Sequence, residues 1–221
     1  AAGVSTGDFE IPYSCRFEAG DTPRLSKTPA GEGNRKTWTF SAWVKRGLID
    51  STSAERVIFS SGGRFGTVVG FNGTDHLVFI VNHAEVQKGL TTNAVYRDPS
   101  AWMHIVAVQD TTESTGSERL KLYVNGSRIT SFSSDTTSGV WQDTDYHVND
   151  DVEHFISGGF RYPDTNRWGG YMAEVHLLDG TVYDADDFGE TGDYGEWKAK
   201  KVAGLTYGTN GFYLDFSDSA A

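Results

Sequence analysis

Two neighbouring stretches decide the fold: "AWMHIVAVQD" at 101–110 and "RLKLYVNGSRIT" at 119–130. Apolar and polar side chains alternate in both stretches, and this two-residue period is that of a β-strand. Around 105–108 both faces of the first stretch are apolar, which favours a central strand covered on two sides. Asn125-Gly126 predicts a tight hairpin turn, because both residues tolerate positive φ. The bridge between the stretches, "TTESTGSE", is typical of a surface loop, so we expect two neighbouring strands of one sheet.

The same two-residue period recurs along most of the chain. In "KTWTFSAWVKR" (36–46), one face carries Trp38, Phe40, Ala42 and Val44, and the other carries Thr37, Thr39, Ser41, Trp43 and Lys45. Further strands are predicted at 56–61, 65–73, 75–83, 85–92, 152–160, 168–180 and 211–217. Asp184 is placed to cap a single helical turn at 184–189.

These short strands with frequent turns predict an all-β fold, a two-sheet antiparallel β-sandwich. Six Trp, ten Tyr, thirteen Phe and 26 Gly agree with sheets joined by tight turns. We expect one domain over residues 1–221, with its core motifs at 36–190 and terminal extensions at 1–35 and 191–221. The residues predicted to be buried are Trp38, Phe40, Val106, Val108, Leu122 and Val124.

Charge and composition narrow the classes of function. With 30 acidic and 19 basic residues the formal charge is −11, and a surface of that sign repels nucleic-acid phosphates and anionic lipids. No apolar run reaches the 18 residues or so that span a bilayer. Cys15 is the single cysteine, so no intrachain disulfide can form. The first residues lack the basic and apolar segments of a signal peptide. We therefore expect neither nucleic-acid binding nor membrane insertion.

Four motifs carry a family resemblance: "TFSAWVKRG" (39–47), "AWMHIVAVQD", "LKLYVNG" (120–126) and "GGYMAEVHLLDG" (169–180). Their order and spacing resemble laminin G-like domains of the concanavalin A-like superfamily, over roughly residues 36–190. The resemblance implies a jelly-roll sandwich in which Trp102 and His104 pack into and across the sheets.

A narrower similarity concerns "RLSKTPAGEGNRKTWTFSAWVKRG" (24–47), "RDPSAWMHIVAVQDTT" (97–112) and "YGTNGFYLDFSDSA" (207–220). These stretches look like those of marine bacteriophage proteins that carry this jelly roll. The similarity implies a virion protein at the virion surface, on the tail or the capsid exterior. Its partners would then be other virion proteins or further copies of itself in a homo-oligomer.

Some concanavalin A-like proteins are glycoside hydrolases, and their catalytic carboxylates lie on a strand with the pattern E-x-D-x-x-E. The nearest stretch is "AEVHLLD" (173–179), in which Met172, Glu174, His176 and Leu178 are in phase and the second carboxylate is missing. We interpret Glu174 as a sheet-stabilising acid. Cys15 lacks the context of a reactive thiol, and no serine lies in a G-x-S-x-G turn. The sequence predicts no enzyme and no catalytic residue.

No cofactor is expected, with calcium as the one ion that the acidic loops could hold. The candidate ligands lie in 143–151 and on the next loop: Asp143, Asp145, Asn149, Asp150, Asp151, Asp164 and Asn166. The EF-hand pattern is absent, and such acidic loops are usually solvated surface. The six histidines show no spacing typical of a zinc site.

The long segment 134–168 supplies the candidate ligand-binding residues. Its aromatic and polar side chains of the kind that hold sugars are Trp141, Tyr146, Arg161, Tyr162, Asn166, Arg167 and Trp168. Loop tryptophans also cover sheet edges or contact sister subunits, so these residues equally predict an assembly interface.

We therefore expect a non-catalytic structural or attachment module of a virion, on a phage tail fibre or a capsid appendage. It would bind a host-surface polysaccharide or a neighbouring virion protein. The alternative is a secreted carbohydrate-binding module or a polysaccharide-degrading glycoside hydrolase.

Overall fold

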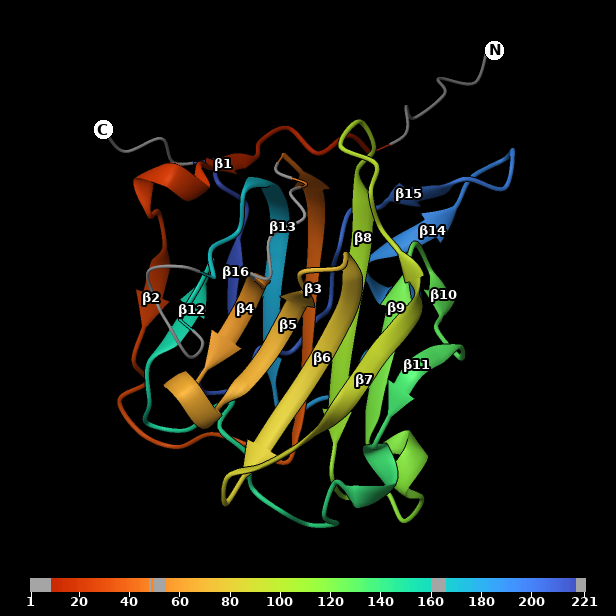
Figure 1. The fold of residues 1–221 in the computed structure, drawn as a ribbon. Helices are drawn as coiled ribbons and strands as arrows, with labels where there is room; N and C mark the ends of the chain where they lie inside the picture. Colours follow the sequence, from red (N-terminus) through yellow and green to blue (C-terminus); the bar gives the residue numbers. More distant parts are fainter. Residues whose placement is uncertain (1–8, 48, 50–54, 160–165, 218–221) are drawn as a thin grey trace, which may run out of the picture.

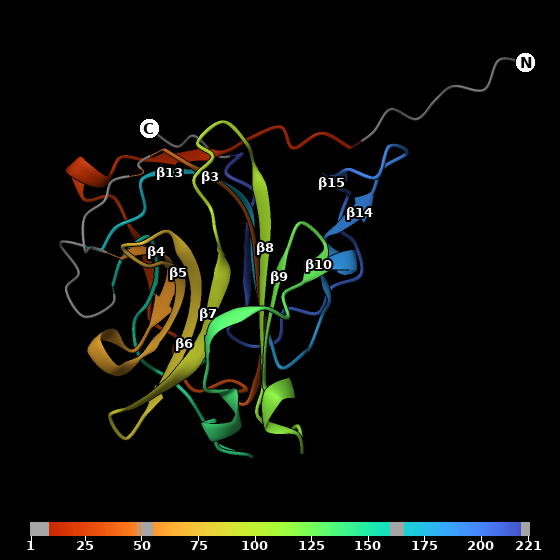
Figure 2. The same cartoon turned by 45° about the vertical axis from the view of Figure 1, so that its right-hand side comes forward.

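The computed structural model describes residues 9–47, 49, 55–159 and 166–217. Two antiparallel sheets lie face to face, as Figures 1 and 2 show. Helical structure in the described residues is confined to short 3₁₀ turns: η1 (Ala19–Asp21), η2 (Gly63–Phe65), η3 (Gly116–Glu118), η4 (Thr137–Gly139) and η5 (Ala185–Asp187). The predicted all-β, two-sheet antiparallel sandwich is confirmed. No helix in the described ranges is long and apolar enough to cross a membrane.

Sheet A has the strand order β1-β13-β3-β8-β9-β10, and β16 also pairs with β13. Its strands are β1 (Cys15–Phe17), β3 (Thr37–Arg46), β8 (Met103–Asp110), β9 (Leu120–Val124), β10 (Ser127–Arg128), β13 (Gly170–Asp179) and β16 (Phe212–Leu214). The predicted pairing of the two stretches that decide the fold is confirmed, with Ile105 opposite Val124 and Gln109 opposite Leu120. Asn125 (φ 48°) and Gly126 (φ 78°) form the predicted turn into β10.

Sheet B has the order β11-β7-β6-β5-β4-β12-β2. Its strands are β2 (Leu25–Lys27), β4 (Arg56–Ser61), β5 (Thr67–Phe71), β6 (His76–His83), β7 (Val86–Val95), β11 (Phe132–Asp135) and β12 (His154–Ile156). Periodicity did not predict β1, β2 or β11. They are edge strands of three or four residues, too short to show alternation.

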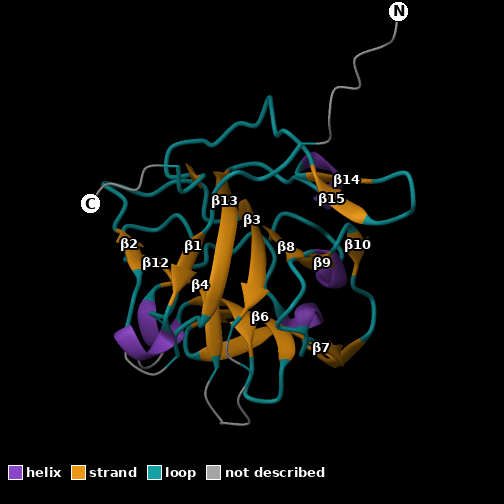
Figure 3. Ribbon diagram, turned by 90° about the horizontal axis from the view of Figure 1, so that it is seen from above, coloured by secondary structure: helices purple, strands orange, loops and turns teal. Residues whose placement is uncertain are grey.

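A small third sheet pairs β14 (Gly189–Thr191) with β15 (Trp197–Ala199). Figure 3, seen from above, places this hairpin beside sheet A and away from sheet B. The helical turn predicted at 184–189 is the 3₁₀ turn η5. Asp184 caps it, and the carboxylate of Asp187 accepts the backbone N–H of Asp184 at 2.8 Å.

The main core lies between the sheets. Trp38 and Phe40 of β3 are fully buried there, and the Phe40 ring stacks on Phe59 with centroids 4.7 Å apart. Five of the six residues predicted to be buried are buried, and Val124 is half-buried against this core. Burial of each large apolar side chain contributes about 1.5–3 kcal/mol.

Alternation along β8 divides its side chains between two apolar environments. Met103, Ile105 and Ala107 join the core between the sheets, whereas Val106 and Val108 are buried on the outer face of sheet A. This explains why both faces of the stretch 105–108 are apolar. The outer face of sheet A is therefore covered by another part of the chain.

Candidate functional site

Residues 183–207 cover part of the outer face of sheet A. Figure 2 shows the β14–β15 hairpin on the side of β8 and β9 opposite to sheet B. The cover packs Phe188 and Ala185 onto Val106, Val108 and Leu178 of the sheet. The same cluster is contacted by four partly buried side chains: Trp197, Val202, Leu205 and Tyr207. Between cover and sheet lie a groove and a smaller cavity.

The groove has a volume of about 450 Å³ and is rich in aromatic rings. It is lined by the N-terminal segment 10–14, by Trp43, Trp102 and Ala173 of the sheet side, and by Trp197, Lys198 and Ala199 of β15. We call it the tryptophan groove. Three tryptophans from three distant parts of the sequence thus meet at one opening, and Tyr13 stands half exposed beside them.

Trp102 lies at the open end of the groove, and its prediction as a core residue is wrong. Its side chain is 37% exposed, because β8 begins at Met103 and the cover over the outer face does not close over Trp102. The ring makes one edge contact with Tyr171, at 6.3 Å between centroids. Trp102 is therefore available to a ligand.

The other two tryptophans are held rigidly by His104. Trp43 lies opposite His104 in the β3–β8 pairing, and their rings stack at 5.0 Å between centroids. The Trp197 ring also lies against His104, with the centroids 6.0 Å apart and the planes at 19°. The indole N–H of Trp197 donates to Nδ1 of His104 at 3.2 Å. His104 thus fixes the two tryptophans, Trp43 and Trp197, that line the groove.

His104 is the satisfied, buried histidine that the resemblance implied. Burial, with a smaller contribution from His176, lowers the pKa of His104 to about 3, so the ring is neutral. Because Nδ1 accepts from Trp197, the proton lies on Nε2 and is donated to Ser41 Oγ at 2.8 Å. This tautomer cannot take a proton from Ser41, so the pair is not an activated nucleophile.

A β-bulge in β13 directs Glu174 onto the same outer face. The register with β3 shifts between Ala173, opposite Trp43, and His176, opposite Ser41. Glu174 sits in the bulge with a left-handed backbone (φ 46°), which strains a residue other than glycine. The predicted phase of this strand is wrong at one residue: Met172 joins the core between the sheets, while Glu174 and His176 face outward. A bulge re-aims side chains in this way.

Glu174 and His176 line the smaller cavity, of about 270 Å³. Its other walls are Phe9, Lys201, Val202, Tyr207 and Tyr213. Tyr213 donates its hydroxyl to Glu174 Oε2 at 2.7 Å, and its ring stacks on His176 at 4.4 Å. Burial raises the pKa of Glu174. Burial also lowers the pKa of His176 to about 4.

Asp179, the last acid of the glycosidase-like stretch, has a structural role. Its Oδ2 accepts the backbone N–H groups of Thr209 and Asn210, and its Oδ1 accepts that of Asn34. These bonds fasten both terminal extensions to the end of β13. In the cavity that Glu174 lines, no second carboxylate occurs among the described residues.

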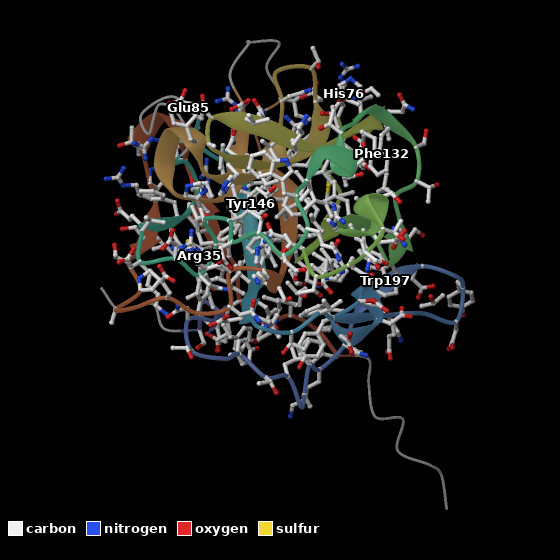
Figure 4. All side chains as sticks on the ribbon, turned by 90° about the horizontal axis from the view of Figure 1, so that it is seen from below. Arg35, His76, Glu85, Phe132, Tyr146 and Trp197 are labelled. Carbon is white, nitrogen blue, oxygen red and sulfur yellow. The ribbon has the colours of Figure 1, made fainter. Side chains whose placement is uncertain are left out.

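The structure separates the predicted ligand-binding residues of 134–168. Trp141 is 48% exposed, but Tyr146 and Trp168 are buried in the main core and cannot stack on a ligand in this conformation. Figure 4, seen from below, shows Tyr146 near the centre of the view and Trp197 toward its edge. Trp168 stacks on Phe71 at 5.9 Å. Tyr146 contacts His83 at one end of β6, whereas Phe71, the contact of Trp168, pairs with Leu77 at the other end, so the two rings fill opposite ends of the core.

The polar members of the predicted set are structural where the structure describes them. Asn166 is buried and donates to Glu55 at 3.2 Å. Arg167 is buried and donates to the carbonyl of Thr22 at 2.5 Å. Arg161 and Tyr162 lie outside the described residues.

The predicted calcium ligands do not converge. Asp143, Asp145 and Asp151 are exposed, while Asp150 pairs with Arg35 at 2.8 Å and accepts the N–H of Asp151. Within the described ranges no group of three or more His, Cys, Asp or Glu is placed to hold a metal ion. The expectation of no cofactor, with calcium as the one possible ion, stays a prediction. Of the other candidates, Asn149 donates to the carbonyl of Asn34, and Asp164 lies outside the described residues.

Sequence analysis missed the tryptophan groove, although one signal for it was present. Trp43 alternates onto the polar face of 36–46, among threonine, serine and lysine. A large aromatic on such a face is either covered by another segment or offered to a ligand. Trp197 gave no signal, because the pairing of β15 with β14 and its packing on His104 are long-range.

Known proteins share this architecture. Residues 22–186 match the concanavalin A-like lectin/glucanases superfamily. Mouse laminin α1 chain domains LG4-5 match with 9% identity and a TM-score of 0.52, over 96% of this chain and 50% of that one. Domain 4 of a GH43 extracellular arabinanase from Geobacillus stearothermophilus, in complex with arabinotriose, matches with 14% identity and a TM-score of 0.52, over 80% and 75%. No curated protein sequence matches the chain.

At these identities the similarity to solved structures concerns the fold. The family match is of a different kind, because it spans most of the sequence and includes β3, β8, β9 and β13, which carry the resembling motifs. This chain belongs to the concanavalin A-like lectin/glucanases superfamily and has the laminin G-like sandwich.

Proposed function

We propose that this protein is a non-catalytic binding module that holds a saccharide in the tryptophan groove. The observation that carries the proposal is the meeting of Trp43, Trp102 and Trp197 at one opening of about 450 Å³. Aromatic rings present large, rigid apolar faces, and these match the C–H faces of sugar rings. Glu10, Ser14 and Lys198 border the groove and offer hydrogen bonds to hydroxyl groups.

The rigidity of the wall favours binding. Trp43, His104 and Trp197 are already stacked, so a ligand need not order them on arrival. Ordering a mobile side chain at an interface costs about 0.5–1.5 kcal/mol, which a preorganised groove avoids. Trp102 is partly exposed without a covering partner in the described residues, as the ligand-contacting residue should be.

The virion is the proposed setting. Support comes from the similarity of 24–47, 97–112 and 207–220 to marine bacteriophage proteins. A tail fibre or capsid appendage would use the groove for host-surface polysaccharide. The solved arabinanase domain, in complex with arabinotriose, supports the compatibility of this sandwich with a sugar ligand.

The absence of catalysis is part of the proposal. Retaining glycosidases hold two carboxyl groups about 5 Å apart, and inverting ones about 6.5–9.5 Å apart. Glu174 shares its cavity with two tyrosines and a neutral histidine. His104 cannot activate Ser41, because the nitrogen that faces Ser41 Oγ already carries the proton.

The test is binding of a panel of marine and bacterial-surface oligosaccharides, measured by glycan array and by titration of tryptophan fluorescence. Trp102→Ala should weaken binding at least tenfold, because it removes the exposed face of the groove. Tyr194→Ala is the matched control, since Tyr194 is 97% exposed at the tip of the β14–β15 hairpin and lines no groove. Equal binding by wild type and Trp102→Ala would contradict the proposed site. Loss of binding in Trp141→Ala alone would favour the loop 134–168 instead.

A further inference from the structure

The smaller cavity continues the tryptophan groove along the same elements. On β13, Ala173 lines the groove and the next residue, Glu174, lines the cavity. In the cover, 198–199 line the groove and 201–202 line the cavity. In the N-terminal segment, Glu10 lines the groove and Phe9 lines the cavity. The groove and the cavity are therefore lined by nearby positions of the same three segments.

His176 lines this cavity and carries a polar atom without a hydrogen-bond partner in the described structure. Its side chain is 2% exposed, and its Nε2 has no hydrogen-bond partner among the described residues. Its Nδ1 lies 2.8 Å from the Tyr207 hydroxyl. Glu174 Oε2 lies 4.0 Å from Nε2, and this carboxylate favours the tautomer with the proton on Nε2. A buried N–H donor is thus left over, and such a group usually has a partner.

Glu174 supplies the complementary acceptor. A carboxylate has about four acceptor positions, and the one hydrogen bond to this carboxylate in the described structure comes from Tyr213. The bulge that strains the backbone at Glu174 turns Val175 and Leu177 toward the core between the sheets and Glu174 toward the cavity. Strain of this kind, roughly 1–3 kcal/mol, is concentrated at ligand sites. The bulge therefore places an acceptor beside the free donor of His176.

We infer that this cavity is a subsite for one neutral sugar ring of the saccharide bound in the tryptophan groove. One ring hydroxyl donates to Glu174, and the adjacent hydroxyl accepts from Nε2–H of His176. Two neighbouring hydroxyl groups match an acceptor and a donor that lie 4.0 Å apart. The inference rests on the proposed function, because the groove brings the saccharide to the cavity.

Size and charge define the class of sugar. A volume of about 270 Å³ is below the roughly 300–1,000 Å³ of drug-sized ligand sites, so it suits a single ring. Glu174 is buried inside the cavity, whereas Lys201 is exposed. A uronate or sulfated ring would bring its negative charge against a buried carboxylate, which disfavours it. The cavity therefore selects neutral rings.

The experiment uses saturation-transfer NMR of the full chain with single-ring probes: methyl glycosides of glucose, galactose and mannose, and methyl glucuronide. We expect at least one neutral glycoside to bind and the glucuronide to bind at least tenfold more weakly. Glu174→Gln should weaken the neutral glycoside about tenfold, because the charged acceptor becomes a neutral amide that makes a weaker hydrogen bond. His176→Phe keeps the ring that stacks on Tyr213 but removes the donor, and it should have a similar effect. Tyr194→Ala is the control, and thermal unfolding checks that each variant is folded.

The outcomes separate the two proposals. If oligosaccharides bind with dependence on Trp102 while Glu174→Gln and His176→Phe bind all probes and oligosaccharides like wild type, the subsite is overturned and the groove stands. Tighter binding of the glucuronide than of every neutral glycoside overturns the choice of a neutral ring. If the wild type binds no saccharide of any length, the proposed function fails and the subsite fails with it.

Discussion

The indole N–H of Trp197 donates to Nδ1 of His104, 93 residues earlier in the chain, at 3.2 Å. This bond ties the β14–β15 hairpin to the centre of sheet A. It also fixes the His104 proton on Nε2, where Ser41 receives it. This one contact therefore holds the cover on the sheet, fixes the tautomer of His104 and keeps Trp197 in place along the tryptophan groove.

Trp197→Phe should separate the hydrogen bond from the packing. The substitution keeps an aromatic ring against His104 but leaves Nδ1 buried without a donor, which costs about 1–3 kcal/mol. Urea unfolding measures that loss of stability. Saccharide binding should weaken less than in Trp102→Ala, because the Phe ring still closes the groove. Unchanged stability in Trp197→Phe would show that the hairpin does not depend on this bond.

Acid should destabilise the fold through its buried histidines. The pKa of His104 is about 3 and that of His176 about 4, both lowered chiefly by burial, whereas an unfolded histidine titrates near 6.5. Below pH 6.5 the unfolded chain binds protons that the folded chain excludes, so stability is complete above that pH and falls as the pH drops toward 4. The slope is at most roughly 1.4 kcal/mol per pH unit for each histidine.

Melting temperatures between pH 8 and pH 4 check this dependence. His104→Gln should have a lower melting temperature at pH 8 and a shallower decline below pH 6.5, because one buried titrating group is gone. A variant curve parallel to that of wild type throughout this range would contradict the assignment of the acid sensitivity to His104.

The strands were predictable from sequence because burial imposes a local period. β3, β8 and β9 were found within one or two residues, since each has one face against the main core. The period failed at Glu174, where the bulge inserts an extra residue and changes the face of everything before it. Alternation carries no information about such an insertion.

The site was not predictable because exposure depends on the path of distant segments. Trp168 and Tyr146 lie in a polar stretch of sequence, yet both rings are buried in the core between the sheets. Trp102 lies in an apolar stretch, yet the cover from 183–207 leaves it open. In each case the deciding contact joins residues far apart in the chain.

Calcium should have no effect on stability. Both carboxylate oxygens of Asp150 are engaged, by Arg35 and by the N–H of Asp151, while Asp143 and Asp145 stand exposed to water. Melting curves with chelator and with millimolar calcium should therefore coincide. A rise in melting temperature with calcium that disappears in the double variant Asp143→Ala, Asp145→Ala would instead establish the loop as an ion site.

The last prediction concerns assembly. Of the two loop tryptophans that suggested an interface, Trp168 is buried within the chain, so Trp141 is the one that can report on a partner. Its ring is 48% exposed and makes an edge contact with His83 at 5.0 Å. A half-exposed tryptophan next to a histidine on a long polar segment is the kind of residue found at interface cores. We expect another subunit or virion protein to cover Trp141 in the assembled particle, while Trp102 stays open for saccharide.

Oxidative footprinting of the isolated chain and of the particle measures both residues at once. Protection of Trp141 with continued oxidation of Trp102 supports the two-surface arrangement. Equal oxidation of Trp141 in the two states contradicts the interface, and protection of Trp102 instead would make the tryptophan groove itself the contact between subunits.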